Sequence, residues 1–255
     1  MNKVSPVVKI SLSGLILALV IIFTRFLSIQ NIPFLPFVRI SIGPALIIFA
    51  SIFLGPIYGG VIGGASDILG ILLVPNALGY SINPWFTLVY TVLGILPWCF
   101  YKLFTLIKNE KASFAIVIAT LLSIWIFVLV YGLITPEISG RTFELWIKIL
   151  VFAISFVLIG LTAFALILIN KHFKLESTST YNIALVVLLC ELLVMLIGNS
   201  IVKSIFFEVD LLVVIFMQGI IFFVDIPLNT IVVSYLLKLA NKVFLKKNNV
   251  ENEEK

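Results

Sequence analysis

Strongly polar side chains are rare along the apolar segments of this chain, so each one is a candidate for chemistry. An ionisable group in apolar surroundings is costly, and it usually belongs to a binding site or to a buried pair. Such groups can bind a polar solute, couple transport to an ion gradient, or stabilise one another. The candidates within apolar segments are Asp67, Glu191, Asn199, Gln218, Asp225 and Asn229, and Arg25, Arg39 and Lys203 lie near the ends of such segments.

The carboxylates allow more than one interpretation. Asp67 follows a glycine-rich stretch, and we interpret it as a polar residue of the core. Glu191 and Asp225 suit a structural pair with a nearby basic group as well as they suit a functional role. Asn199 and Lys203 are four residues apart, so both side chains can point the same way from one helix.

Signatures of catalysis are absent from the sequence. It contains no His-Glu-x-x-His, no Gly-x-Ser-x-Gly and no nucleotide-binding loop. His172 is the only histidine, and the only cysteines, Cys99 and Cys190, lie in apolar runs that are typical of buried small hydrophobes. We therefore expect no enzyme activity, no metal site and no cofactor. A transporter of this kind would need a partner that hydrolyses ATP, or an ion gradient.

The composition indicates the elements that must position these residues. Of 255 residues, 62% are hydrophobic and only 11% are charged, and the formal net charge is +5. Soluble domains are roughly 45–50% apolar and about 25% charged. The composition thus excludes a soluble globular protein, a disordered chain and a nucleic-acid binder. The class it predicts is an integral membrane protein.

The apolar runs predict an all-α bundle of about eight transmembrane helices. Each run suits a helix that spans the bilayer, which needs about 20 apolar residues, and none shows the alternation of a membrane β-barrel strand. Two short runs are separated only by Gly55-Pro56, so their division is the least certain boundary. The expected spans are 7–28, 40–57, 58–74, 84–106, 112–134, 146–170, 181–201 and 209–237.

The basic residues predict the orientation. Positive charge favours the cytoplasmic side. With eight spans and the N-terminus inside, 5 of the 17 lysines and arginines fall outside, namely Arg25, Arg39, Arg141, Lys148 and Lys203. We therefore expect a multi-pass protein of the cell membrane with both termini in the cytoplasm.

Small and aromatic residues mark three further segments. The glycine-rich stretch 55–70 favours close helix packing inside the protein. Gly14 and Ala18, four residues apart on the first helix, suit internal packing or docking of another membrane subunit equally well. The uncharged loop 75–86 is either part of an interfacial aromatic belt or a lid that covers a flat ring by stacking.

Several strings occur in an order that resembles the substrate-binding (S) components of energy-coupling factor (ECF) transporters, and the folate-specific branch in particular. They are TRFLSIQ at 24–30, RISIG at 39–43, LGPIYGG at 54–60, SDILG at 66–70 and PWFTL at 84–88, with a weaker match in LIGNS at 196–200 and in 226–238. The resemblance implies six family helices within one transmembrane domain over 1–255. Residues 7–106 would hold helices one to four and 181–241 helices five and six. Residues 112–176 would be a two-helix insertion, and 242–255 a cytoplasmic tail.

The same resemblance implies how the protein works. S components bind a vitamin from outside and dock to a transmembrane coupling (T) subunit, whose two ATPase subunits drive release inside. Gly14 and Ala18 would form the docking face here. Arg39 and Arg25 would stand at the mouth of the pocket, with the loop from Pro75 to Trp85 as its lid.

A folate ligand would match the candidate residues. Its anionic glutamate needs cationic partners, its pterin edge needs amide groups, and its rings can stack on aromatic side chains. The expected substrate-binding residues are Arg25, Arg39 and Lys203 for the glutamate, Asn83, Asn199 and Gln218 for the pterin, and Tyr80, Trp85 and Phe86 for stacking.

Two departures from the folate pattern leave other substrates and other functions as alternatives. Trp85 stands where the folate branch tends to have glycine, and 218–225 lacks the basic residue that the branch tends to place there. Riboflavin or pantothenate is therefore an alternative substrate. A secondary transporter driven by protons or sodium through Asp67, Glu191 or Asp225 is a second alternative. An intramembrane enzyme or a structural membrane subunit is a third.

Overall fold

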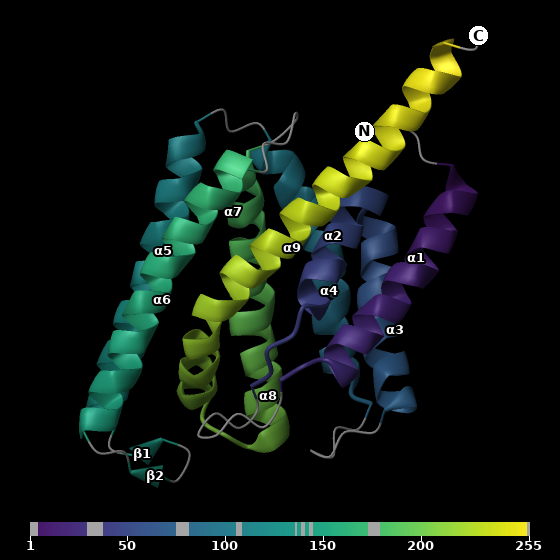
Figure 1. Cartoon of the computed structure of the whole chain (residues 1–255). Helices are drawn as coiled ribbons and strands as arrows, with labels where there is room; N and C mark the ends of the chain where they lie inside the picture. Colours follow the sequence, from purple (N-terminus) through teal and green to yellow (C-terminus); the bar gives the residue numbers. More distant parts are fainter. Residues whose placement is uncertain are drawn as a thin grey trace.

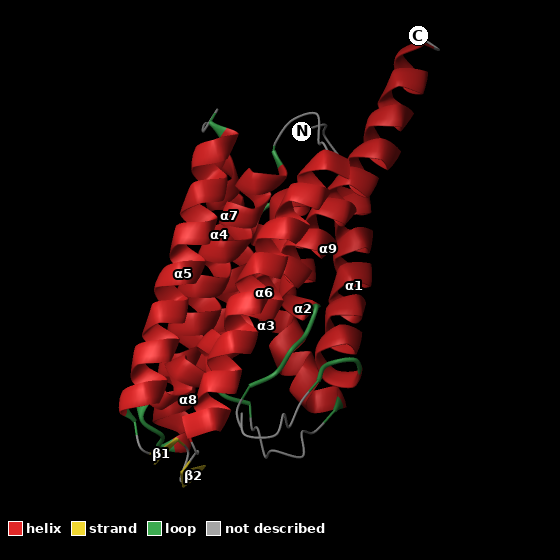
Figure 2. Ribbon diagram, turned by 60° about the vertical axis from the view of Figure 1, so that its left-hand side comes forward, coloured by secondary structure: helices red, strands yellow, loops and turns green. Residues whose placement is uncertain are grey.

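A computed structural model describes residues 5–29, 38–74, 82–105, 109–135, 137–138, 141–142, 145–172 and 179–253 of the chain. Within these ranges the chain forms a bundle of apolar helices that run roughly side by side (Figures 1 and 2). Among the described residues, seven helical segments are long and apolar enough to cross a membrane, and an eighth, Gly43–Leu54, is shorter. The prediction of an all-α membrane protein with about eight helices is confirmed.

The helices follow the apolar runs closely. The first is α1 (Pro6–Ile21), continued by the π-helical turn η1 (Ile22–Phe26). The bundle then comprises α2 (Gly43–Leu54), α3 (Pro56–Leu73), α4 (Pro84–Phe104), α5 (Glu110–Ile134) and α6 (Leu145–His172). One further segment joins α7 (Thr180–Cys190), the π-helical η2 (Glu191–Gly198) and α8 (Asn199–Phe207), and the last helix is α9 (Leu211–Glu253).

The division between α2 and α3 lies where the sequence places it. Gly55 has φ +110°, which a side chain rarely adopts, so the first helix ends there. Pro56 opens the next helix, where its missing N–H costs nothing. The boundary that was least certain from the apolar runs is therefore correct.

The glycine-rich stretch brings α3 and α4 into close backbone contact. A Cβ atom on Gly59 or Gly63 would collide with the backbone oxygens of Gly94 and Tyr90 on α4. Small residues permit this approach, and close approach is how helices associate inside a bilayer. The interpretation of this stretch as internal packing is confirmed.

Two features differ from the expectation. Between α5 and α6 the chain forms a short antiparallel hairpin, β1 (Glu137–Ile138) with β2 (Arg141–Thr142), at one end of the bundle (Figure 2). The last helix continues to Glu253, through most of the expected tail. That tail contains no glycine or proline to end the helix, so its backbone hydrogen bonds continue beyond the apolar segment.

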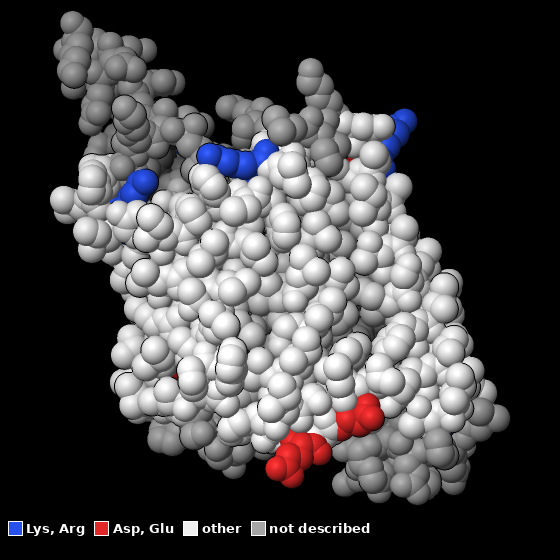
Figure 3. Space-filling model, turned by 180° about the vertical axis from the view of Figure 1, so that it is seen from behind, with Lys and Arg blue, Asp and Glu red and all other residues white. Residues whose placement is uncertain are grey.

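On one face of the bundle the two ends carry opposite charge. α1 begins and α9 ends at the same end (Figure 1). Lysines and arginines gather at that end and acidic side chains at the other (Figure 3). The long apolar surface between them fits a multi-pass protein of the membrane.

Candidate functional site

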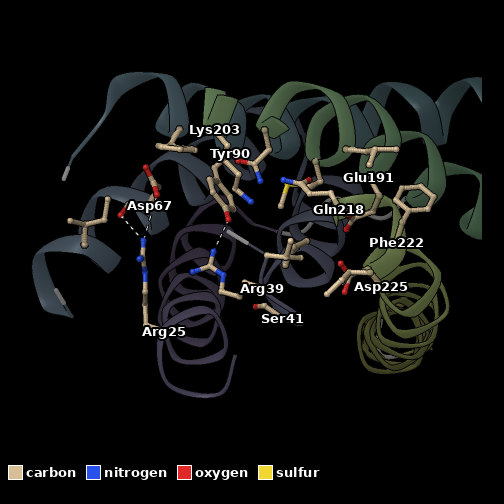
Figure 4. A pocket seen from close by; sticks show the side chains of 18 residues that line it. Arg25, Arg39, Ser41, Asp67, Tyr90, Glu191, Lys203, Gln218, Phe222 and Asp225 are labelled. Atoms are coloured by element: carbon tan, nitrogen blue, oxygen red, sulfur yellow. Dashed lines mark hydrogen bonds and ion pairs between the residues drawn. The ribbon is translucent and has the colours of Figure 1, made fainter. Parts of the chain in front are cut away.

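A cavity of about 100 Å³ lies among η1, α2, α3, α4, η2 and α9, with α8 at its side (Figure 4). Both π-helical turns contribute to its wall, Arg25 from η1 and Glu191 from η2. Such turns often occur at functional sites because they redirect side chains within a helix. The lining consists of Arg25, Val38, Arg39, Ser41, Pro44, Asp67, Ile71, Phe86, Tyr90, Glu191, Met195, Leu196, Asn199, Lys203, Gln218, Ile221, Phe222 and Asp225.

Arg39 is held over the cavity by neutral groups. Its Nη2 donates to the Tyr90 hydroxyl at 2.8 Å, and its Nη1 donates to the carbonyl oxygen of Thr24 at 3.3 Å. These bonds fix the guanidinium without neutralising it. The arrangement leaves a positive charge at the cavity, which is suited to an anionic group of a ligand.

Arg25, unlike Arg39, forms an ion pair with a carboxylate. Its Nη2 lies 3.5 Å from Asp67 Oδ1, and both side chains are only 6% exposed. The Thr87 hydroxyl donates to Asp67 Oδ2 at 2.8 Å, which completes the partners of that carboxylate. The guanidinium of Arg25 packs against Gly70, where a Cβ atom would lie only 2.5 Å from Arg25 Nε. A glycine at this position therefore makes space for the arginine. The ion pair joins η1 to α3 and α4.

Lys203 and Gln218 form a second polar contact, between α8 and α9. In the amide orientation that satisfies both neighbours, Gln218 accepts from Lys203 Nζ at 2.9 Å and donates to the Met195 carbonyl oxygen at 2.5 Å. Lys203 is buried, with 8% of its surface exposed. A buried ammonium needs polar partners, and it can exchange them for those of an anionic ligand.

Two carboxylates occupy the part of the cavity between η2 and α9. Glu191 Oε1 accepts from Asn229 Nδ2 at 2.7 Å. Asp225 lies one helical turn before Asn229 on α9 and lines the cavity together with Glu191. The cavity therefore contains one ion pair, Arg25 with Asp67, and a separate pair of carboxylates between η2 and α9 (Figure 4).

Of the nine substrate-binding candidates, eight are described by the structure, and six of these eight line the cavity. Trp85 is 63% exposed and Asn83 caps α4 by accepting from the Trp85 backbone N–H at 2.9 Å, so neither contributes to the lining. Tyr80 and most of the expected lid, 75–81, lie outside the described residues. The candidates in the lining are Arg25, Arg39, Phe86, Asn199, Lys203 and Gln218, and Asp67 joins them.

Several lining residues were missing from the expected site. Glu191 and Asp225 stand out as polar residues within apolar runs, but nothing in the sequence favours a ligand-binding role over a structural pair. Tyr90, Ser41 and Phe222 carry no signal of their own, because hydroxyl and aromatic residues are common in membrane helices. Only their spacing along the chain from the polar residues of the predicted site could have indicated that they line the cavity.

The outer face of α1 is open. Gly14 and Ala18 are both exposed, and a Cβ on Gly14 would meet nothing within 4 Å. Neither residue serves packing within the described part of the chain. The alternative of internal packing for this pair is therefore not supported.

Comparisons with known proteins give a consistent result. A sequence profile of the family described as "ECF transporter, substrate-specific component" matches residues 8–140, just over half of the chain. The chain is also 29% identical over 150 residues to the folate transporter FolT of Clostridium novyi (strain NT), a match covering 59% of this chain and 72% of that protein. No solved structure matches the chain. The matched residues run from α1 through α5, so the expectation that 112–176 is an insertion stays a prediction.

Proposed function

Because the chain belongs to the family of ECF transporter substrate-specific components, we propose that it binds a folate-like vitamin from outside the cell. The observation that carries this proposal is the buried cavity, in which Arg39 and Lys203 supply positive charge for the glutamate of folate. Its similarity to a folate transporter supports the same substrate class. No reaction is assigned to the chain, since the family is a component of transporters.

The size of the cavity implies that binding rearranges its side chains. Ligand pockets usually measure about 300–1,000 Å³, whereas this cavity measures about 100 Å³. Arg39 bonds to Tyr90 and Lys203 to Gln218, and all four residues line the cavity. A ligand that replaces these bonds needs hydrogen-bonding groups of its own, which favours a polar vitamin.

Energy for transport comes from partners in this proposal. The chain would dock through Gly14 and Ala18 to a transmembrane coupling (T) subunit that works with two ATPase subunits. The open face of α1 supports this role, because small residues let a second helix approach closely in a bilayer.

The orientation follows from charge. The end of the bundle that holds both chain termini contains the start of α1 with Lys9, the end of α4 with Lys102, the start of α5 with Lys111 and the end of α6 with Lys171. Lys148 lies near the start of α6, at the other end. Positive residues favour the cytoplasmic side. We therefore place both termini in the cytoplasm and the Arg39 side of the cavity toward the outside.

Titration of the purified protein with three vitamins tests the substrate. Calorimetry with folic acid, riboflavin and pantothenate should give submicromolar binding, about −8 kcal/mol or stronger, for folic acid alone. Binding of riboflavin or pantothenate, but not of folic acid, would show that the bound vitamin is the substrate in place of folate. A folded protein that binds none of the three would remove the proposal.

A further inference from the structure

One face of α9 presents three different polar and aromatic groups to the cavity. Gln218, Phe222 and Asp225 are spaced four and three residues apart, so they lie along one side of the helix. All three line the cavity, and Phe222 is only 3% exposed. An amide, a ring and a carboxylate in this order suit a flat heteroaromatic ligand that is polar along one edge.

The carboxylate of Asp225 has an acceptor that the fold does not use. Its Oδ1 is buried, and no described residue donates a hydrogen bond to it. Glu191 provides the contrast, because its Oε1 accepts from Asn229 at 2.7 Å. A buried acceptor without a donor is costly to keep and is an exception that needs a reason. A ligand that brings an N–H donor would remove that cost.

We propose that Asp225 is the specificity residue that accepts hydrogen bonds from two adjacent N–H donors on the edge of a ring lying against Phe222. This inference rests on the proposed function and refines it. In a folate, the adjacent donors are the 2-amino group and N3–H of the pterin. The carboxylate presents two oxygens side by side, so it matches that edge in a two-point contact.

The same contact discriminates among vitamins. The corresponding edge of riboflavin has one N–H between two carbonyl oxygens, and an oxygen facing the Asp225 carboxylate is repelled. Pantothenate has no ring to lie against Phe222. The cations Arg39 and Lys203 also line the cavity, and they would bind the anionic end of the ligand.

A pair of ligands and a pair of variants test this assignment. The ligands are folic acid and its 2-desamino-2-methyl analogue, which lacks the amino donor. We expect wild-type protein to bind folic acid at least about 10-fold more tightly than the analogue, the effect of one hydrogen bond to a charged group. In Asp225→Asn, an amide nitrogen replaces one carboxylate oxygen and cannot accept a hydrogen bond from the ring. The preference of this variant for folic acid over the analogue should therefore fall below about 3-fold.

The control is Asp210→Asn, the same chemical change at the start of α9. Asp210 is exposed and accepts from the Leu212 backbone N–H at 2.7 Å, a bond that asparagine can keep. This variant should retain the preference of the wild type. Size-exclusion chromatography and helical content establish that each variant is folded.

The outcomes separate the two proposals. If wild-type protein does not bind folic acid, the proposed function fails and this inference fails with it. If it binds folic acid and the analogue equally well, only the role of Asp225 is overturned, and that measurement needs no variant. An Asp225→Asn protein that keeps the full preference would also overturn the role.

Discussion

At the scale of residues, two arginines that look alike in the sequence have different surroundings. Arg25 pairs with Asp67, and Thr87 supplies the second partner of that carboxylate. Arg39 donates to two neutral oxygens, those of Tyr90 and Thr24. The ion pair with Asp67 neutralises the charge of Arg25, whereas the neutral partners of Arg39 leave its charge available to a ligand.

Replacing Arg39 by methionine should therefore weaken binding of folic acid at least about 10-fold, because a charge-assisted contact to the glutamate is lost. Binding of pteroic acid, which lacks the glutamate, should change much less. The measurement is calorimetry on purified protein with both ligands. Equal losses for both ligands would show that Arg39 does not contact the glutamate.

Arg25→Met is the matched control, and its main effect should be on stability. Removing one partner of a buried ion pair costs about 3–5 kcal/mol because the other charge stays buried. The midpoint of thermal unfolding in detergent should therefore fall for this variant and much less for Arg39→Met. The opposite order would exchange the roles of the two arginines.

The sequence predicted most of the cavity because charged and amide residues are conspicuous in an apolar chain. Arg39, Asn199, Lys203 and Gln218 were found in this way. Trp85 was included as an aromatic residue of the expected lid loop, and it lies on the surface because an aromatic ring at a helix start also suits the membrane interface. Phe222 was missed for the converse reason, since nothing but its position on α9 distinguishes it from other phenylalanines.

At the scale of elements, helix α1 offers the clearest test. Ala18 is exposed on the open face that also contains Gly14. Ala18→Leu adds a bulky side chain to this face, so vitamin uptake in cells with the coupling and ATPase subunits should fall by at least about 10-fold through lost close packing. Folic acid binding to the purified chain should not change.

Ala115→Leu is the control for that variant, because Ala115 is exposed on α5, a different helix. It adds the same apolar volume away from α1, and uptake should persist. Loss of both binding and uptake in Ala18→Leu would indicate internal packing, and normal uptake would remove the docking role.

Helices were easier to predict than the irregularities within them. Long apolar runs leave no alternative to a helix in a bilayer, and Gly55-Pro56 marks a boundary by backbone chemistry. The π-helical turns η1 and η2 have no comparable signature, because each depends on how a wider turn fits its neighbours. Those turns carry Arg25 and Glu191 into the cavity, so the unpredicted local structure is part of the candidate site.

At the scale of the whole molecule, the separation of charge predicts a single orientation. The end of the bundle with both chain termini contains Lys9, Lys102, Lys111 and Lys171, whereas Glu208 and Asp210 lie in the turn between α8 and α9 at the other end. In a background of Cys99→Ala and Cys190→Ala, a membrane-impermeant maleimide should label Glu208→Cys in intact cells. Lys111→Cys, at the start of α5, should react only after permeabilisation and serves as the matched control, because both positions are exposed. The reverse pattern would turn the cavity toward the cytoplasm, and a vitamin could not then be captured from outside.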